Sequence, residues 1–297
     1  MATDQGPVVQ SAMLRTELLQ LRRDQNMTQE TVARALDWHP SKLIRIEGGK
    51  SRITKTDLQA LLRQYGVVST HRQERLEALA QGARGTAWWD EYRDVIDEAT
   101  ISYIGHEPGA VVLRQFENAL IPGLLQTREY ATAVVSHFVK DRKDRSVERL
   151  VALRMRRQEA MRGRDQPPRQ EFIVDEAAIR RHIGMRTDTQ IMARQLRRIL
   201  NLVEGDELVG VRIVPFSAGA YAGLGGPFVL VEFDKGLNDV LYVEVPSALQ
   251  AHSTFTSDND SVSTYRDAFE AIAEDALSAD ESAALIGKIA EEFEAAG

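Results

Sequence analysis

The sequence of 297 residues predicts an α+β protein in two parts. An all-α domain of five helices is expected over residues 11–83, and an α+β domain with an antiparallel sheet over residues 88–297. Apolar residues recur at helical spacing in short, closely separated segments of the first part. A glycine-containing stretch, residues 82–86, follows it. Beyond that stretch, helical segments lie before and after a run of strand-like segments, which is the order of an α+β domain.

The first two helices have recognisable ends. Leucines at i, i+4 and i+7 mark the first helix, and Asn26 predicts its exit because asparagine tolerates a left-handed backbone. Thr28 is a good N-cap for a second helix that runs to about Leu36. Gln29 stands in the first turn of that helix, where its side chain and the free N–H groups can point at a phosphate.

A turn and three further helices complete the first domain. Asp37 can take a left-handed conformation in the turn, and Pro40 favours the first position of a third helix. That helix ends at Gly48-Gly49. Thr54 caps a fourth helix, and a fifth runs over about residues 72–81.

The third helix has a polar outer face. Leu43 and Ile46 point inward, which leaves Ser41, Lys42 and Arg45 on the opposite side. The guanidinium of Arg45 can donate two hydrogen bonds to a guanine, a contact worth about 1–3 kcal/mol of discrimination. Two structural alternatives stay open: a helical bundle whose charges are merely solvated, and a surface ion pair for Arg45.

Charge is divided unevenly along the chain, whose net charge is −7. Residues 11–85 carry 13 Lys/Arg against 8 Asp/Glu, whereas residues 86–297 carry 24 against 35. The first segment can therefore face phosphates, while the second repels DNA that is bound without specificity.

The composition argues against several classes of protein. No run approaches 18 apolar residues and the N-terminus lacks the layout of a signal peptide, so we expect a cytoplasmic protein without a membrane partner. With no cysteine there is no disulfide framework and no thiolate metal site. The sequence offers no nucleophile–His–acid set, no His pair at metal-ligand spacing and no phosphate loop. We therefore expect no enzymatic activity, catalytic residue, metal or cofactor, and an enzyme fused to a DNA-binding module is the rival hypothesis.

The first domain resembles the helix-turn-helix of the Xre family, which includes the phage repressors and Cro proteins. The residues that carry the resemblance are Thr28-Gln29-Glu30-Thr31-Val32-Ala33 and Pro40-Ser41-Lys42-Leu43-Ile44-Arg45-Ile46-Glu47-Gly48-Gly49-Lys50. The resemblance covers about the first quarter of the chain. It implies that Gln29 clamps the DNA backbone and that Glu47 pairs with Arg22. It implies base-edge contacts from Pro40, Ser41, Lys42 and Arg45. It implies phosphate contacts from Lys50, Ser51 and Arg52.

Two positions depart from the family pattern. Asp37 stands where the turn usually has glycine, and His39 stands where the recognition helix usually has a Ser or Thr cap. Aspartate is among the residues that best tolerate a left-handed backbone, and a histidine ring accepts an amide proton less well than serine does. His39 either caps the helix and faces solvent or reaches a phosphate or base.

The second domain mixes helical and strand-like segments. Trp88 to Tyr92 open an acidic helix whose aromatics we expect to pack between domains or in the core rather than to hold a cofactor. Strands are expected over residues 110–116, 171–174, 208–215, 228–233 and 240–245. Helices are expected from a cap at Thr127 and over residues 146–161, 262–277 and 282–295. We expect these helices to cover one face of the sheet.

A second resemblance spans most of residues 88–285. The segments that carry it are Ile121-Pro122-Gly123-Leu124-Leu125-Gln126-Thr127, Tyr130-Ala131, Arg154 to Gln158, Asp175-Glu176-Ala177-Ala178-Ile179 and Val214-Pro215-Phe216 with Gly219. They are similar to the uncharacterised domain that follows an Xre-type reader in many actinobacterial regulators, of which WhiJ-like proteins are examples. The resemblance implies a regulator that works with a small partner protein encoded beside it, and such proteins are often called antitoxin-like.

Three segments of the second domain are candidate sites. The glycine-rich residues 218–226 lead into a strand rather than a helix, so they form a mobile hairpin loop or line a ligand or partner groove. Asp175-Glu176 is more typical of a helix N-cap than of a catalytic carboxylate pair. Residues 140–164 hold 10 Lys/Arg against 4 Asp/Glu, which indicates a solvated face, a phosphate contact or a partner surface.

These features together predict a DNA-binding regulator. We expect a homodimer on a pseudo-palindromic operator of double-stranded DNA, because one small reader buries too little surface for tight binding. We expect repression. For the regulatory input we keep two hypotheses, a small neighbour-encoded protein docking on the second domain and a small apolar molecule held between sheet and helices.

Overall fold

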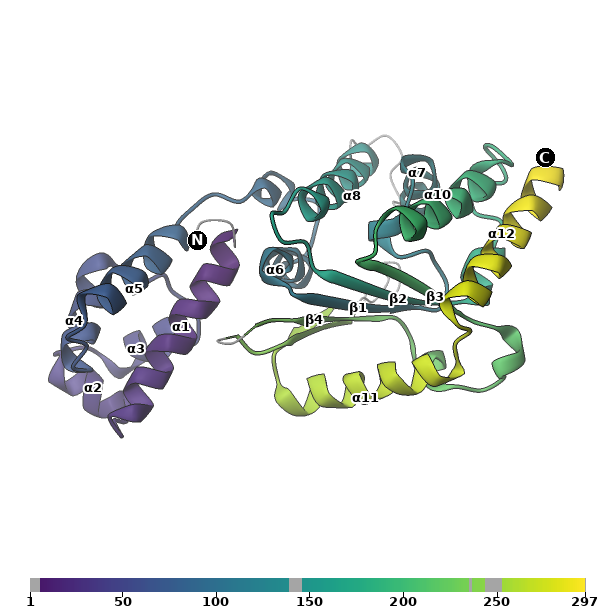
Figure 1. Cartoon of the computed structure of the whole chain (residues 1–297). Coiled ribbons are helices and arrows are strands. Elements are labelled where there is room, and N and C mark those ends of the chain that lie inside the picture. Colours follow the sequence, from purple (N-terminus) through teal and green to yellow (C-terminus); the bar gives the residue numbers. More distant parts are fainter. Residues whose placement is uncertain (1–5, 139–145, 235–236, 244–252, 297) are drawn as a thin grey trace. The chain divides into compact units, whose positions relative to one another are not determined.

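The computed structural model describes residues 6–138, 146–234, 237–243 and 253–296. The chain divides into two compact units. Unit 1 comprises Met1–Asp90, Gly105–Gly109 and Phe233–Leu237, and unit 2 comprises Glu91–Ile104, Ala110–Glu232 and Asn238–Gly297. Figure 1 shows the helical unit 1 in purple and blue, and the sheet-containing unit 2 in teal to yellow. No helix among the described residues is long and apolar enough to cross a membrane.

Unit 1 contains the five predicted helices. They are α1 (Gly6–Asp24), α2 (Gln29–Ala35), α3 (Pro40–Glu47), α4 (Lys55–Gln64) and α5 (Thr70–Gly82). Each helix contributes buried side chains to one core, among them Leu18, Val32, Leu43, Leu61 and Leu76. Burial of these apolar faces, rather than intrinsic propensity, stabilises helices as short as α2 and α3. The helix α1 begins earlier than residue 11, where we placed the start of the domain.

Unit 2 is built on a six-stranded sheet of order β3-β2-β1-β4-β5-β6. The strands are β1 (Val112–Glu117), β2 (Arg169–Asp175), β3 (Val209–Val214), β4 (Phe228–Glu232), β5 (Val240–Val243) and β6 (Thr254–Thr256). Phe116 of the central strand β1 lies opposite Ile173 of β2 and Phe228 of β4. Of the strand predicted over residues 240–245, the last two residues lie outside the described residues.

The α+β class is confirmed, but the sheet is mixed rather than wholly antiparallel. The strands β1, β2 and β3 are parallel to one another, whereas β4, β5 and β6 pair in the antiparallel sense. The reason lies in the connections. The helices α7 (Arg128–Phe138) and α8 (Ser146–Arg162) separate β1 from β2, and α9 (Glu176–Arg180) and α10 (Ile191–Gly205) separate β2 from β3. Helical crossovers of this length let the next strand run parallel to the last.

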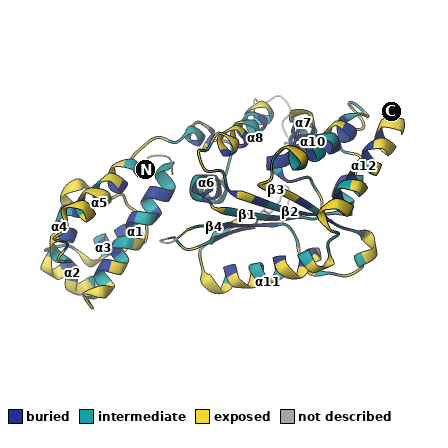
Figure 2. Ribbon diagram, viewed as in Figure 1, coloured by how far each residue is buried: buried dark blue, intermediate teal, exposed yellow. Residues whose placement is uncertain are grey.

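Helices cover both faces of the sheet, so the prediction of one covered face is wrong. Figure 1 shows α11 (Asn259–Asp275) on one side and α6 (Glu98–His106), α8, α10 and α12 (Ala279–Ala296) on the other. On the first face Phe228 and Leu230 pack with Phe269 of α11. On the other face Tyr103 of α6 stacks on Tyr242 of β5. Figure 2 accordingly shows the central strands buried. Four consecutive residues of β4 are buried, which is typical of a strand covered on both sides.

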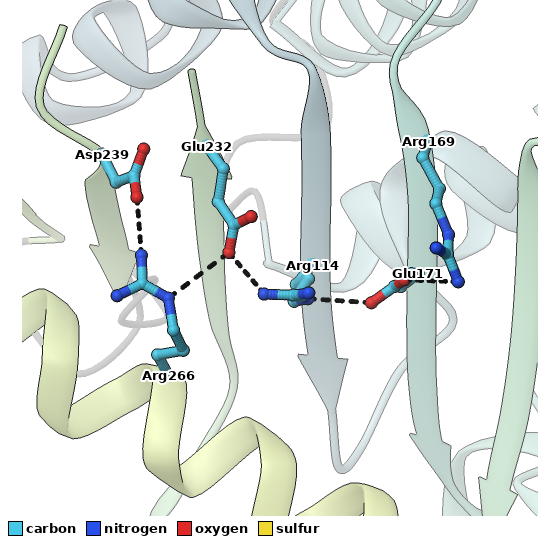
Figure 3. Close-up of polar contacts among 6 residues, drawn as sticks. All are labelled: Arg114, Arg169, Glu171, Glu232, Asp239 and Arg266. Atoms are coloured by element: carbon cyan, nitrogen blue, oxygen red, sulfur yellow. Dashed lines mark hydrogen bonds and ion pairs between the residues drawn. The ribbon is translucent and has the colours of Figure 1, made fainter. Parts of the chain in front are cut away.

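A row of charges crosses the face of the sheet next to α11 (Figure 3). Arg114 of β1 lies 2.8 Å from Glu171 on β2 and 2.5 Å from Glu232 on β4. Arg266 of α11 lies 2.6 Å from Asp239. Every arginine in this row has a carboxylate neighbour, so the row ties the strands and α11 together as a structural network.

Two candidate sites of the second domain are structural. Asp175 Oδ1 accepts the amide N–H of Ala177 over 2.7 Å, so it is the N-cap of α9, as predicted. The glycine-rich residues 218–226 begin at the end of one short 3-10 turn, η4 (Phe216–Ala218), and contain a second, η5 (Ala222–Gly225). A side chain at Gly223 would approach the ring of Phe116 to 2.3 Å, and the hydroxyl of Tyr221 donates to Asp175.

The tryptophan-rich and basic segments also differ from their predictions. Trp88–Tyr92 forms a 3-10 helix, η1, rather than an α-helix, and the predicted burial of its aromatics is confirmed for Trp89 and Tyr92. Residues 140–145 of the basic segment lie outside the described residues. In the helix that follows, Arg149 pairs with Asp94, and Arg156 lies 2.5 Å from Glu91. Much of the basic charge of α8 is therefore neutralised within unit 2.

Candidate nucleic-acid interface

The helices α2 and α3 form the predicted helix-turn-helix. Thr28 Oγ1 accepts the amide N–H of Thr31 over 3.1 Å and so caps α2. The turn carries Asp37 in the left-handed region, at φ 54°, and the amide of Trp38 closes it on the carbonyl of Ala33 over 2.8 Å. Aspartate thus takes the place of the expected glycine, as its tolerance of this conformation allows.

His39 caps the N-terminus of α3. Its Nδ1 accepts the amide N–H of Ser41 over 3.3 Å and lies 2.8 Å from Ser41 Oγ. An accepting Nδ1 puts the ring proton on Nε2. The ring is exposed, and Pro40 follows it at the first helical position, as predicted. The capping alternative for His39 is therefore realised, and a further contact of its Nε2–H with a phosphate or base stays a prediction.

The outer face of α3 presents Arg45. Leu43 and Ile46 are buried, as their spacing predicted, and Arg45 is exposed on the opposite side. Arg45 makes no ion pair with any residue that the structure describes, so the surface-ion-pair alternative finds no carboxylate there. Beside it Ile44 leaves 51% of its surface exposed.

Ile44 is a candidate contact residue that the sequence analysis missed. The signal was present in the sequence, because Ile44 does not belong to the inward spacing of Leu43 and Ile46. An exposed apolar side chain on a recognition helix can contact the methyl group of thymine.

Lys42 does not share that outer face. Its Nζ lies 2.6 Å from Asp57 Oδ1 at the start of α4 and 3.9 Å from the centre of the Trp38 ring. Both contacts hold the ammonium against unit 1. Ser41 is half-buried next to it. Of the four residues for which the resemblance implied base contacts, Pro40 and Arg45 are exposed, whereas Lys42 is held by an ion pair.

A buried ion pair joins α1 to α3. Glu47 accepts two hydrogen bonds from the guanidinium of Arg22, over 2.7 and 3.0 Å, which confirms the implied pair. Gln29 Nε2 donates to the same carboxylate over 2.6 Å. Arg22 also donates to the carbonyl of Met27 over 2.7 Å. The hydrogen bonds that Arg22 donates to Glu47 raise the pKa of Arg22. This Arg22–Glu47 clamp fixes the end of α3 and the start of α2, and it leaves Gln29 with one amide proton for a phosphate.

The loop after α3 continues the exposed basic surface. The carbonyl of Arg45 accepts the amides of Lys50, over 2.8 Å, and Ser51, over 3.2 Å. Gly49 permits this reversal because its φ of 72° lies in the left-handed region. The side chains of Lys50, Ser51 and Arg52 are exposed, and neither cation is paired within the described part of the chain. Arg45, Lys50 and Arg52 are thus three exposed cations close in sequence, and none has an ion pair among the described residues.

Two family models match the chain, one in each unit. Residues 14–80 match the model described as a helix-turn-helix domain. Residues 101–288, more than half of the chain, match the model described as a domain of unknown function, DUF5753. The chain belongs to the DUF5753 family. No curated protein and no solved structure matches this DUF5753 chain. Its unit 1 is a DNA-binding helix-turn-helix domain, because the matched residues include α2, the turn and α3.

Proposed function

We propose that the protein is a transcriptional regulator of the Xre type that recognises a specific sequence of double-stranded DNA with α3 in the major groove. The observation that carries the proposal is the exposed guanidinium of Arg45, unpaired among the described residues, at the centre of the outer face of α3. A guanidinium in that position can donate two parallel hydrogen bonds to guanine O6 and N7. Lys50 and Arg52 stand beside it as phosphate contacts, which position the protein without reading sequence.

The protein acts as a homodimer on a pseudo-palindromic operator in this proposal. A two-fold axis presents two copies of α3 to half-sites about 34 Å apart, which doubles the base contacts of one small reader. A dimer seated on a promoter occludes it, so repression is the proposed outcome. Bacterial chromosomal DNA lies in the cytoplasm. The proposed location of a bacterial regulator that binds it is therefore the cytoplasm.

A small partner protein encoded beside this gene is the proposed regulatory input. The resemblance of unit 2 to the domain of WhiJ-like, antitoxin-like regulators supports this proposal, and no catalytic role is assigned to that unit. The alternative is that unit 2 senses a small molecule that gates DNA binding.

Genome-wide DNA capture tests the proposal. The full-length protein is expressed in its host with and without the neighbouring gene, and the bound fragments are sequenced. We expect a shared inverted repeat in both strains and a change in occupancy when the partner is removed. Bound fragments without a common motif would contradict sequence-specific recognition. Identical occupancy in the two strains would contradict control by the partner protein.

A further inference from the structure

Unit 2 contains a cavity that none of the functions above uses. It has a volume of about 270 Å³ and lies where the start of α7, the end of α8 and the middle of α10 meet. Figure 1 shows these three helices as neighbours on the side of the sheet away from α11. Its size suits a small molecule rather than a drug-sized one, for which pockets of roughly 300–1,000 Å³ are typical.

The lining of this cavity is strongly basic. Arg128 from α7, Arg162 from α8 and Arg198 from α10 all line it, and Glu159 is the one carboxylate among its lining residues. None of these three arginines forms an ion pair with a residue that the structure describes. The lining therefore holds an excess of two positive charges.

Other arginines of α8 and α10 do form ion pairs. Arg156 of α8 pairs with Glu91 over 2.5 Å, and Arg197 of α10 pairs with Glu294 over 2.8 Å. The arginines of the row in Figure 3 likewise each face a carboxylate. Among the described residues, the three arginines that line the cavity thus differ from these neighbours in having no ion pair.

Arg198, which lines the cavity, is held in place by a hydrogen bond. It donates to Gln158 Oε1 over 3.0 Å, and the amide of Gln158 is fixed in turn by the carbonyls of Gly123, over 2.8 Å, and Gln126, over 2.9 Å. Gln158 is buried. The Nε of Arg198 is also buried and has no hydrogen-bond partner in the described structure. This Nε has almost no accessible surface, so an oxyanion in the cavity is expected to contact the terminal nitrogens of the Arg198 guanidinium rather than Nε.

The electrostatics of Arg198 point in the same direction. Burial lowers the pKa of Arg198, and the like charge of Arg162 lowers it further. Two guanidiniums that repel each other across a cavity raise the free energy of the empty protein. A dianion between them removes the repulsion and accepts charge-assisted hydrogen bonds from both.

We propose that this cavity is a binding site for a small phosphate monoester. A phosphate monoester carries close to two negative charges at pH 7, which equals the excess of the lining, and its oxygens match the fork of donors on a guanidinium. The side chain of Met155 lines the cavity as well and supplies an apolar wall for the organic part of the molecule. The inference deepens the small-molecule alternative of the proposed function, with an anionic ligand in place of the apolar one expected from the sequence.

Calorimetric titration of the full-length protein with small ligands tests this site. No DNA is present, so a negative result would count against the cavity site and not against the proposed DNA-binding function. The probes are ribose 5-phosphate, inorganic phosphate and malonate. We expect saturable binding of ribose 5-phosphate, weaker binding of inorganic phosphate, which lacks the organic part, and weaker binding still of malonate. Affinity should fall below about pH 6, where a monoester takes up its second proton.

Matched variants locate the binding. Arg162→Gln and Arg198→Gln should each weaken binding of ribose 5-phosphate about tenfold or more, because each removes a charge-assisted hydrogen bond. The control Arg197→Gln removes the same charge from the same helix on the side that faces Glu294, and it should change affinity less than about twofold. The thermal midpoint of ligand-free Arg198→Gln should change little, because the lost hydrogen bond to Gln158 Oε1 is offset by relief of the repulsion from Arg162.

Several outcomes would overturn the proposal. Absence of binding by either phosphate probe, or equal losses in Arg162→Gln and Arg197→Gln, would show that the cavity is not the site. Tighter binding of malonate than of ribose 5-phosphate would overturn the ligand class. A lower thermal midpoint for Arg198→Gln, with unchanged binding in Arg162→Gln, would show that Arg198 is a structural residue.

Discussion

Lys42 and Arg45 stand one turn apart on α3, and their surroundings separate their roles. The ammonium of Lys42 is held by Asp57 and the Trp38 ring, whereas Arg45 is exposed and lacks an ion pair among the described residues. Helical periodicity predicted that both side chains point away from Leu43. It could not show that Asp57, which belongs to the next helix, pairs with one of them.

Arg45→Ala is expected to weaken binding to the operator by about 1–3 kcal/mol and to relax the base preference at one position of each half-site. The physical reason is the loss of a two-hydrogen-bond contact with one guanine. Titrations of the wild type and the variant on the operator and on singly substituted operators measure both effects. An equal loss on operator and random DNA would show that Arg45 contacts only phosphate.

Lys50→Ala and Arg52→Ala are expected to behave differently, lowering affinity for all sequences. Each variant should reduce the slope of log affinity against log salt concentration by about 0.9, because one fewer counterion is released. Titrations at several salt concentrations on operator and random DNA provide the slope. The exposed control Arg63→Ala, on α4, should leave it unchanged. A wild-type slope in both loop variants would remove this loop from the interface.

At the scale of elements, the parts of the fold that local chemistry determines were predictable. Thr28, His39 and Thr54 cap their helices as expected, because each cap depends on residues close in sequence. The parallel pairing of β1 with β2 was missed although helices were predicted between these strands, from Thr127 and over residues 146–161, and such helical crossovers favour parallel strands. The helix α10 was missed, although its buried residues follow helical spacing, and the sequence analysis left that stretch unassigned.

The Arg22–Glu47 clamp connects two elements, and its loss is expected to be costly. Glu47→Ala should lower the free energy of unfolding of unit 1 by about 3–5 kcal/mol, because it leaves a guanidinium that is 12% exposed without its partner. The matched control is Glu17→Ala, which removes a carboxylate that Arg72 and Arg75 contact at the surface. That change should cost less than about 1 kcal/mol.

Urea denaturation followed by tryptophan fluorescence measures this difference selectively. The three tryptophans of the chain, at positions 38, 88 and 89, all belong to unit 1. Their fluorescence therefore reports the unfolding of that unit in the full-length protein. Equal losses of stability in the two variants would contradict the assignment of the clamp as the element that fixes α3.

At the scale of the whole molecule, charge is divided unevenly between the N-terminal and C-terminal parts of the chain. Composition predicted this division, with 13 Lys/Arg against 8 Asp/Glu in residues 11–85 and 24 against 35 in residues 86–297. The cavity of unit 2 could not be predicted. Its arginines come from three helices far apart in the sequence, and only the folded chain brings them together.

Residues 86–297 alone are expected to form a dimer without measurable affinity for DNA, and residues 1–85 a helical, mostly monomeric fragment. The excess of acidic residues repels the duplex, and arginines of α8 such as Arg149 and Arg156 already pair with carboxylates. Sedimentation of both fragments, with DNA titrations at two salt concentrations, checks this division. A monomeric 86–297 fragment would contradict dimerisation through unit 2, and salt-dependent DNA binding by it would contradict the electrostatic argument.

Selection of binding sites from a pool of randomised duplexes tests sequence-specific recognition by α3 most directly. The full-length protein and its Arg45→Ala variant are taken through the same rounds of selection, and the recovered sequences are compared. We expect the wild type to enrich one inverted repeat that contains a guanine at the same position of each half-site. The variant should enrich a repeat in which that position alone has lost its preference. Recovery of unrelated sequences by the wild type, or of the same guanines by both proteins, would contradict recognition through Arg45.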